Sequence, residues 1–199
     1  MPFNASDDAW QGQPTVTAAK VVVLGAFAVG KTTFVHTVSE LQPVFTEEQL
    51  TRAGERIDTL HTLVAKTTTT VALDFGRLTL GDIVLYLFGT PGQERFQAAI
   101  QQQVSGALGG VVLVDAARIA ESFFFLDLLE RAGVPFVVAL NEFDDRPVGV
   151  DDAELREALA LGPALPLRRI DARDRTSALT ALTALVTHLL ETLPPEPNR

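Results

Sequence analysis

The sequence predicts an α/β fold, with a mainly parallel sheet of about six strands, one antiparallel edge strand, and helices on both faces. Apolar segments typical of buried strands alternate with helical patterns along most of the chain, and this order produces a parallel sheet covered on both faces. A turn signal at Gly81-Asp82 predicts the antiparallel pair. The 199 residues, 47% of them hydrophobic, are enough for one domain with a sizeable core.

Composition divides the chain into three parts. Residues 1–17 are polar and contain Pro2, Gly12 and Pro14, so we expect a flexible N-terminal arm. The folded domain is expected over 18–193, and a short C-terminal tail over 194–199.

The first predicted strand runs into a glycine-rich loop. A run of valines, Val21 to Val23, enters the pattern G-x-x-x-x-G-K-T from Gly25 to Thr32, and a helical apolar stripe follows it. In such a P-loop the backbone N–H groups cradle phosphate oxygens, Lys31 adds a point charge, and the Thr32 hydroxyl is placed to hold Mg²⁺. An ordinary glycine-containing turn is the alternative, but the flanking strand and helix disfavour it. We expect a nucleoside triphosphate to contact Gly25, Phe27, Ala28, Val29, Gly30, Lys31, Thr32 and Thr33.

The later elements follow the same alternation. Residues 41–67 are polar and weakly periodic, and we interpret them as a long excursion with a helical turn or two. A Thr- and Val-rich strand follows over 67–76, and the hairpin joins 78–80 to 83–88. Further strands are predicted over 110–114, 134–140 and 167–170, and helices over 93–104, 119–132, 151–161 and 176–192.

Charge and composition exclude several kinds of protein. The net charge of −9, with no basic cluster to offset it, argues against a nucleic-acid-binding surface. The absence of cysteine excludes disulfides, thiolate catalysis and Cys-ligated zinc, and it suits a reducing cytosol. No apolar run approaches the roughly 18 residues of a membrane span. We therefore expect a cytoplasmic protein with no membrane anchor of its own, recruited to a membrane only through partners.

Four segments resemble motifs of Ras-like small GTPases. The segment Gly89 to Phe96 reads G-T-P-G-Q-E-R-F and resembles their switch II sequence D-T-A-G-Q-E-R-F. Asn141 to Asp144 reads N-E-F-D and resembles the guanine-reading N-K-x-D motif. The segment Thr70 to Phe75 is similar to the T-I-G-V-D-F of the Rab branch, and Asp171 to Arg173 occupies the place of the short S-A-K-like loop. The resemblance spans roughly 18–192 and implies a G-domain.

The resemblance favours a guanine base, with Ala172 and Arg173 completing the base site. Guanine presents N1–H and the 2-amino group side by side, so the single carboxylate of Asp144 can accept both protons. The Asn141 amide can bond N7 and brace the P-loop. Because adenine lacks this donor pair, facing it would cost Asp144 about 1–3 kcal/mol. A helix-capping turn before Arg146-Pro147 is the alternative interpretation of Asn141 and Asp144.

The same resemblance implies the catalytic roles, which we assign to Gln93, Lys31 and Thr70. Thr70 would be the switch I threonine that senses the γ-phosphate and completes the Mg²⁺ shell. The Gly92 N–H would bond the γ-phosphate, and Gln93 would orient the attacking water. Loss of the γ-phosphate would release both segments, which makes the protein a two-state switch.

One departure from the pattern concerns the metal. Position 89 is glycine, whereas the family's switch II opens with an aspartate that anchors Mg²⁺ through water. Asp74 on the neighbouring strand is the nearest substitute, and a structural role for it is the alternative; the expected metal-site residues are Thr32, Thr70 and Asp74. The same loss occurs in bacterial GTPases of the MglA type and in the GTP/ATP-binding proteins of actinobacterial conservons, which the chain resembles most.

Two further departures predict weaker nucleotide binding and slow hydrolysis. Glu142 replaces the lysine whose stem normally covers the guanine ring, so nucleotide affinity is expected to be weaker. Phe27 replaces a P-loop glycine at a position where a side chain crowds the glutamine and an incoming arginine finger. Arg95, Arg52 and Arg56 are candidates for an arginine supplied in cis, with a solvated surface role as the alternative for each.

The sequence therefore predicts a GTP- and GDP-binding, Mg²⁺-dependent molecular switch in bacterial signalling that hydrolyses GTP slowly. The alternatives are a nucleotide-binding signalling scaffold with negligible hydrolysis, or a P-loop kinase or ATPase. The resemblance also implies a dimeric Roadblock/LC7-fold partner, acting as co-GAP or effector, and a neighbouring sensor-kinase complex.

Overall fold

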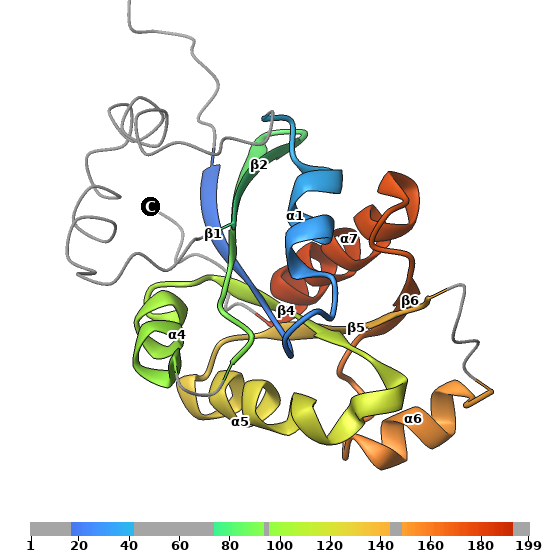
Figure 1. The fold of residues 1–199 in the computed structure, drawn as a ribbon. Coiled ribbons are helices and arrows are strands. Elements are labelled where there is room, and N and C mark those ends of the chain that lie inside the picture. The colour runs from blue at the N-terminus through green and yellow to red at the C-terminus, as the bar shows by residue number, and fades with distance from the viewer. Residues whose placement is uncertain (1–16, 42–73, 94–95, 144–148, 193–199) are drawn as a thin grey trace, which may run out of the picture.

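The computed structural model describes residues 17–41, 74–93, 96–143 and 149–192. Their strands form one six-stranded sheet in the order β2-β3-β1-β4-β5-β6, in which every neighbouring pair is parallel except β2 with β3 (Figure 1). The predicted fold class is confirmed, including the antiparallel strand at one edge. The strands are β1 (Thr17–Leu24), β2 (Asp74–Leu80), β3 (Ile83–Gly89), β4 (Gly109–Val114), β5 (Phe136–Asn141) and β6 (Leu167–Ile170).

Helices cover both faces of the sheet, as Figure 1 shows. On one face α1 and α7 pack against the strands, and on the other lie α4, α5 and α6. The helices are α1 (Lys31–Val38), α4 (Gln97–Val104), α5 (Phe123–Ala132), α6 (Asp152–Ala158) and α7 (Arg175–Thr192), and a 3₁₀ segment, η3 (Ala116–Ser122), precedes α5. None of the described helices is long and apolar enough to cross a membrane.

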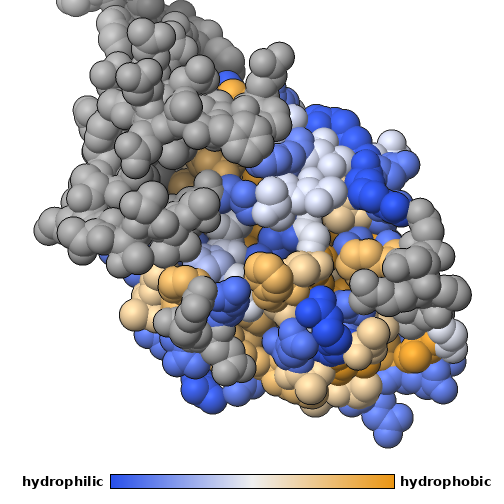
Figure 2. Space-filling model, in the orientation of Figure 1, coloured by the Kyte–Doolittle hydropathy of each residue, from blue (hydrophilic) through white to orange (hydrophobic). Residues whose placement is uncertain are grey.

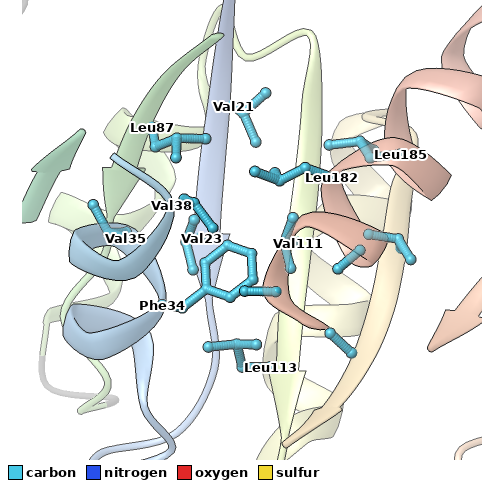
Figure 3. Close-up of a cluster of buried hydrophobic side chains, with 14 of the residues drawn as sticks. Val21, Val23, Phe34, Val35, Val38, Leu87, Val111, Leu113, Leu182 and Leu185 are labelled. Carbon is cyan, nitrogen blue, oxygen red and sulfur yellow. The ribbon is translucent and has the colours of Figure 1, made fainter. Parts of the chain in front are cut away.

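The core beneath α1 fixes the helix that follows the P-loop. Phe34 is completely buried and lies between strand residues and the α7 residues Leu182 and Leu185 (Figure 3). Val35 and Val38 are also completely buried, so the apolar stripe expected in this helix is the face that packs. Burying a side chain of this size contributes about 1.5–3 kcal/mol. The start of α1 is therefore held in place by the core and not by the loop alone.

The hairpin between β2 and β3 brings two residues of the site together. Gly81 has a φ of 58°, the left-handed conformation that the tight turn requires. The resulting register pairs Asp74, at the start of β2, with Gly89, at the end of β3. The predicted strand over 67–76 and the hairpin strand over 78–80 belong to one continuous strand from Asp74 onward. Residues 67–73, like the excursion from 42, lie outside the described residues.

Three helices are shorter than their patterns predict. The helix expected over 93–104 begins at Gln97, because Gln93 lies in a bend and Phe96 has non-helical backbone angles. The α-helix expected over 119–132 begins only at Phe123, because residues 119–122 belong to the 3₁₀ segment η3. The helix expected over 151–161 ends at Ala158, since Ala160 has a left-handed φ of 53°. At its start, Asp151 and Glu154 form a reciprocal capping box.

Figure 2 shows mostly polar and pale residues over α1 and α7 and more apolar ones below them, on the side of α5.

Candidate nucleotide-binding site

The loop between β1 and α1 has glycine at the two positions where its backbone requires one. Gly25 has a φ of 140°, and a Cβ there would lie 2.4 Å from the Leu113 carbonyl oxygen of β4. Gly30 has a φ of 104°, and a Cβ there would lie 2.7 Å from the Asn141 side-chain nitrogen. Either side chain would be strained and would collide with neighbouring atoms. The two fixed glycines of the motif are therefore required by the geometry of the loop.

Lys31 is the first residue of α1, and its ammonium points back into the loop. Only 7% of the residue is exposed, and Nζ donates hydrogen bonds to the carbonyl oxygens of Gly25 at 2.8 Å and Ala26 at 2.7 Å. Burial lowers the pKa of Lys31 to about 8, with the Asp74 carboxylate opposing this shift and the Arg118 guanidinium adding to it. A buried cation held by neutral carbonyls is poised to gain from an anion.

Thr32 and Asp74 form the polar pair at which a metal is expected. The Thr32 hydroxyl donates to Asp74 Oδ2 at 2.6 Å. Thr32 lies in the first turn of α1, and Asp74 is the first residue of β2. Asp74 faces Gly89, where a Cβ would lie only 2.8 Å from the Asp74 Cβ and 3.0 Å from Oδ2. Glycine at position 89 therefore leaves the space that the Asp74 carboxylate occupies.

A cavity of about 500 Å³ joins the P-loop, Asp74 and the segment after β3. A Cβ at Gly92 would lie 2.5 Å from Lys31 Nζ and 2.6 Å from the Phe27 backbone nitrogen, so Gly92 packs directly on the P-loop. Thr90 is buried and donates through its N–H to the Val23 carbonyl at 2.9 Å, which anchors this segment to β1. The cavity is lined by Phe27, Ala28, Gly30, Lys31, Thr32, Thr33, Asp74, Thr90, Pro91, Gly92, Gln93 and Phe96.

Asn141, at the end of β5, connects the P-loop to the loop after β6. It is buried, and Nδ2 donates to the Val29 carbonyl at 3.0 Å while Oδ1 accepts from the Ala172 N–H at 2.9 Å. Next to Ala172, the N–H of Arg173 donates to Asp171 Oδ1 at 2.8 Å, and the Arg173 guanidinium lowers the pKa of the Asp171 carboxyl. Both backbone donors of this loop are therefore already engaged within the protein.

Glu142 occupies the position where the resemblance expects a lysine over the base. Its carboxylate accepts from Arg169 Nη1 at 3.1 Å, and Arg169 Nε also bonds Asp152 of α6 at 2.7 Å. Arg169 Nη2 donates to the Val150 carbonyl as well. Arg169 thereby ties the residue after Asn141 to the start of α6.

Several predicted site residues cannot be placed. Thr70 and Asp144 lie outside the described residues, as do Arg52, Arg56 and Arg95. The structure brings the other predicted residues into two adjacent groups: the P-loop, Asp74, Gly92 and Gln93 around the cavity, and Asn141, Ala172 and Arg173 beside Gly30 and Val29.

Arg118 contacts this site, although no sequence motif predicts it there. It lies in η3, and its Nη1 donates to the Phe27 carbonyl of the P-loop at 3.1 Å. The signal was present, because this loop follows the carboxyl end of a parallel strand, where ligands of such sheets bind. No family motif marks the position of Arg118.

The chain matches one family of proteins over most of its length. A family model described as "conserved hypothetical ATP binding protein" matches residues 23–192. The chain belongs to this family. The chain is similar to the uncharacterized protein MJ1339 of Methanocaldococcus jannaschii. The two are 32% identical over 127 residues, which cover 63% of this chain and 70% of the relative.

Solved G-domains share the fold of this family member. The FeoB G-domain from Methanococcus jannaschii superposes with a TM-score of 0.60 at 14% identity, over 87% of this chain and 99% of that one. The translation elongation factor SelB from Methanococcus maripaludis, solved with the GTP analogue GppNHp, gives a TM-score of 0.59 at 14% identity over 92% of this chain. This chain spans 36% of that elongation factor. The protein is thus a P-loop nucleotide-binding protein with a G-domain-like fold.

Proposed function

We propose that the protein is a magnesium-dependent molecular switch that binds GTP and GDP and hydrolyses GTP slowly. The observation that carries the proposal is the hydrogen bond of 2.6 Å between Thr32 and Asp74. Both residues line the cavity that Lys31, Gly92 and Gln93 also line. The P-loop and Lys31 can bind phosphate, the oxygens of Thr32 and Asp74 can bind a metal, and the Gln93 amide can orient a water molecule. These are the parts that phosphoryl transfer to water requires.

Phosphate binding is assigned to the P-loop and Lys31. Lys31 is buried on two carbonyls, and its lowered pKa means that its charged form is poorly solvated. A polyphosphate in the cavity would supply the missing counter-charge beside the N–H groups at the start of α1. Because the chain carries a net charge of −9, attraction of the anion depends on such local groups.

The residues present fit a magnesium ion. Mg²⁺ prefers oxygen ligands, keeps several of its waters, and in nucleotide sites is held by one or two protein groups together with the phosphates. The Thr32 hydroxyl and the Asp74 carboxylate are such groups, and we propose Thr70 as a third. Among the described residues no group of three His, Cys, Asp or Glu side chains is placed to hold a metal ion. The ion would neutralise charge on the phosphate oxygens.

Slow hydrolysis is proposed because of Phe27. The residue is 62% exposed and lies on the wall of the cavity that Gln93 also lines. The Phe27 backbone nitrogen is also where a Cβ at Gly92 would collide, so the P-loop and the segment carrying Gln93 are in close contact here. A bulky group at this place leaves little room for an incoming arginine from another protein.

The choice of GTP rests on Asp144 in the N-E-F-D sequence. The family description favours ATP instead, and the engaged N–H groups of Ala172 and Arg173 offer no further donor to the guanine O6. A P-loop ATPase, or a nucleotide-binding scaffold with negligible hydrolysis, is therefore the second candidate. Competition of ATP against fluorescent GTP decides the base, and Asp144→Asn should shift the preference toward xanthine nucleotides if Asp144 reads the base.

Single-turnover hydrolysis decides the activity. We expect slow, Mg²⁺-dependent GTP cleavage that Gln93→Ala reduces by about 10²-fold, the scale of a lost water-positioning group. Gln102→Ala, on the exposed side of α4, is the matched control and should leave the rate unchanged. A rate near zero that Gln93→Ala does not alter would refute the hydrolase and leave the scaffold.

The partner belongs to the proposal through the resemblance alone. We propose a Roadblock/LC7-fold protein that recognises the triphosphate-bound state, within a bacterial signalling assembly that includes a sensor kinase. A purified Roadblock/LC7-fold protein that bound the GDP- and GTP-loaded forms equally would contradict a switch. Recruitment to a membrane is proposed to occur only through such partners.

A further inference from the structure

Cations hold three consecutive carbonyl groups of the P-loop. Lys31 takes those of Gly25 and Ala26, and Arg118 takes that of Phe27. In an isolated loop these carbonyls would be free to rotate. Fixing these carbonyls also fixes the direction of the N–H groups that follow them, because each peptide unit is planar.

Arg118 is itself held in position by a buried acid. Asp115, at the end of β4, is 4% exposed, and its Oδ2 pairs with Arg118 Nε at 3.1 Å. The other oxygen of Asp115 accepts from the Ala117 N–H at 2.9 Å. Arg118 Nη1 also reaches Glu121 at 3.4 Å, and the backbone of Arg118, at φ −137° and ψ 42°, breaks the helical path of η3. Only about a third of the Arg118 side chain is exposed.

The peptide between Phe27 and Ala28 is where this contact affects the cavity. In a trans peptide the carbonyl oxygen and the following N–H point in opposite directions. Because Arg118 holds the Phe27 oxygen, the N–H of Ala28 is directed away from Arg118, and Ala28 lines the cavity. Ala28 has a left-handed φ of 60°, which costs a non-glycine residue about 1–2 kcal/mol. A charged hydrogen bond to the preceding carbonyl offsets such a cost.

We propose that Arg118 is a positioning residue of the phosphate site, which locks the Phe27–Ala28 peptide so that the Ala28 N–H faces the phosphates. Its guanidinium also places a second positive charge behind the P-loop, close enough to act on Lys31. Arg118 acts through the loop backbone and is not a catalytic residue. This proposal rests on the proposed nucleotide-binding function.

The test compares the affinities of phosphorylated and unphosphorylated ligands. Dissociation constants of Mg²⁺–GTP, Mg²⁺–ATP, GDP and guanosine are measured by calorimetry for the wild type, Arg118→Ala and Arg118→Lys. For the tighter triphosphate we expect Arg118→Ala to weaken binding about tenfold, the loss of one charged hydrogen bond. Guanosine binding should change less than twofold. Arg118→Lys, which keeps the charge, should recover part of the loss.

The control is Arg131→Ala. Arg131 is an exposed arginine of α5 paired with Asp127 at 3.0 Å, far from the P-loop in the chain, and its loss should change none of the constants. Urea unfolding of each variant separates a loss of folding from a loss of phosphate binding. If Arg118→Ala is unfolded, the comparison is made with Arg118→Lys and Arg118→Met.

The outcomes distinguish this proposal from the one on which it rests. If the wild type binds the triphosphates and the Arg118 variants bind them equally well, Arg118 has no positioning role and the proposed function stands. Equal weakening of triphosphate and guanosine would also overturn the role, because it indicates general loosening. If the wild type binds no phosphorylated nucleotide, both proposals fail.

Discussion

Moving one carboxylate across the hairpin tests the assignment of Asp74. The wild type carries its acid at position 74 and glycine at position 89, directly opposite in the register. In the single variant Gly89→Asp, the new Cβ would lie 2.8 Å from the Asp74 Cβ, closer than real Cβ contacts occur. Overpacking of this kind costs about 1–3 kcal/mol, and repulsion between the two carboxylates adds to it.

Removing Asp74 should relieve that cost. Asp74→Gly alone deletes the acceptor of the Thr32 hydroxyl and places a glycine in a strand, which costs about 1 kcal/mol. In the double variant Asp74→Gly/Gly89→Asp, the atoms that collide are gone. Its free energy of unfolding should therefore lie within about 0.5 kcal/mol of that of Asp74→Gly, so that the two substitutions couple by about 1–3 kcal/mol.

Two assays follow the four proteins through this cycle. Urea unfolding gives the coupling energy, and titration with Mg²⁺ of fluorescent nucleotide binding gives the dependence on metal. We expect Asp74→Gly to lose the Mg²⁺ dependence and the double variant to regain most of it. Additive unfolding free energies would refute the packing argument. A double variant without Mg²⁺ dependence, or an Asp74→Gly variant that keeps it, would refute the metal assignment.

Two further predictions concern Lys31 and Phe34. Because burial lowers the Lys31 pKa from 10.5 to about 8, the unfolded chain binds more protons between these pH values. The unfolding free energy of the wild type relative to Lys31→Met should then rise by up to about 3 kcal/mol from pH 8 to 10.5. A difference that stays flat in urea titrations at several pH values would contradict the buried charge. Phe34→Ala should cost about 3–5 kcal/mol of unfolding free energy, since the ring of this α1 residue is completely buried against the sheet and α7. A loss below about 1 kcal/mol by thermal or urea unfolding would show that this core is not well packed.

The fold could be predicted because its signals are local. Strands such as β4 and β5 are buried at every position and appear as short apolar runs, and α1 shows its packed face as a stripe. The P-loop was equally predictable, since the conformations of Gly25 and Gly30 require glycine at fixed spacing. The position of Asp74 opposite Gly89 could also be expected from the sequence, because Gly89 lacks the side chain of its motif; the metal role of Asp74 stays a prediction.

What the sequence could not supply are contacts that only the folded chain creates. Arg118 reaches Phe27 across 91 positions of sequence, and Arg169 reaches Glu142 across 27. Neither pair belongs to a motif, and both depend on which loops the sheet order places side by side. The early end of α6 depends on the left-handed conformation of Ala160, which an alanine in a sequence does not predict.

The pairing of Asp74 with Gly89 also bears on how relatives of this protein are recognised. A search that requires an acidic residue at the end of β3 discards this chain, although an acid stands directly across the strand pair. The two positions compete for one volume, since a Cβ at Gly89 would touch the Asp74 carboxylate. A pattern that accepts the acid at either position, with a small residue at the other, describes the three-dimensional site more faithfully than a linear motif.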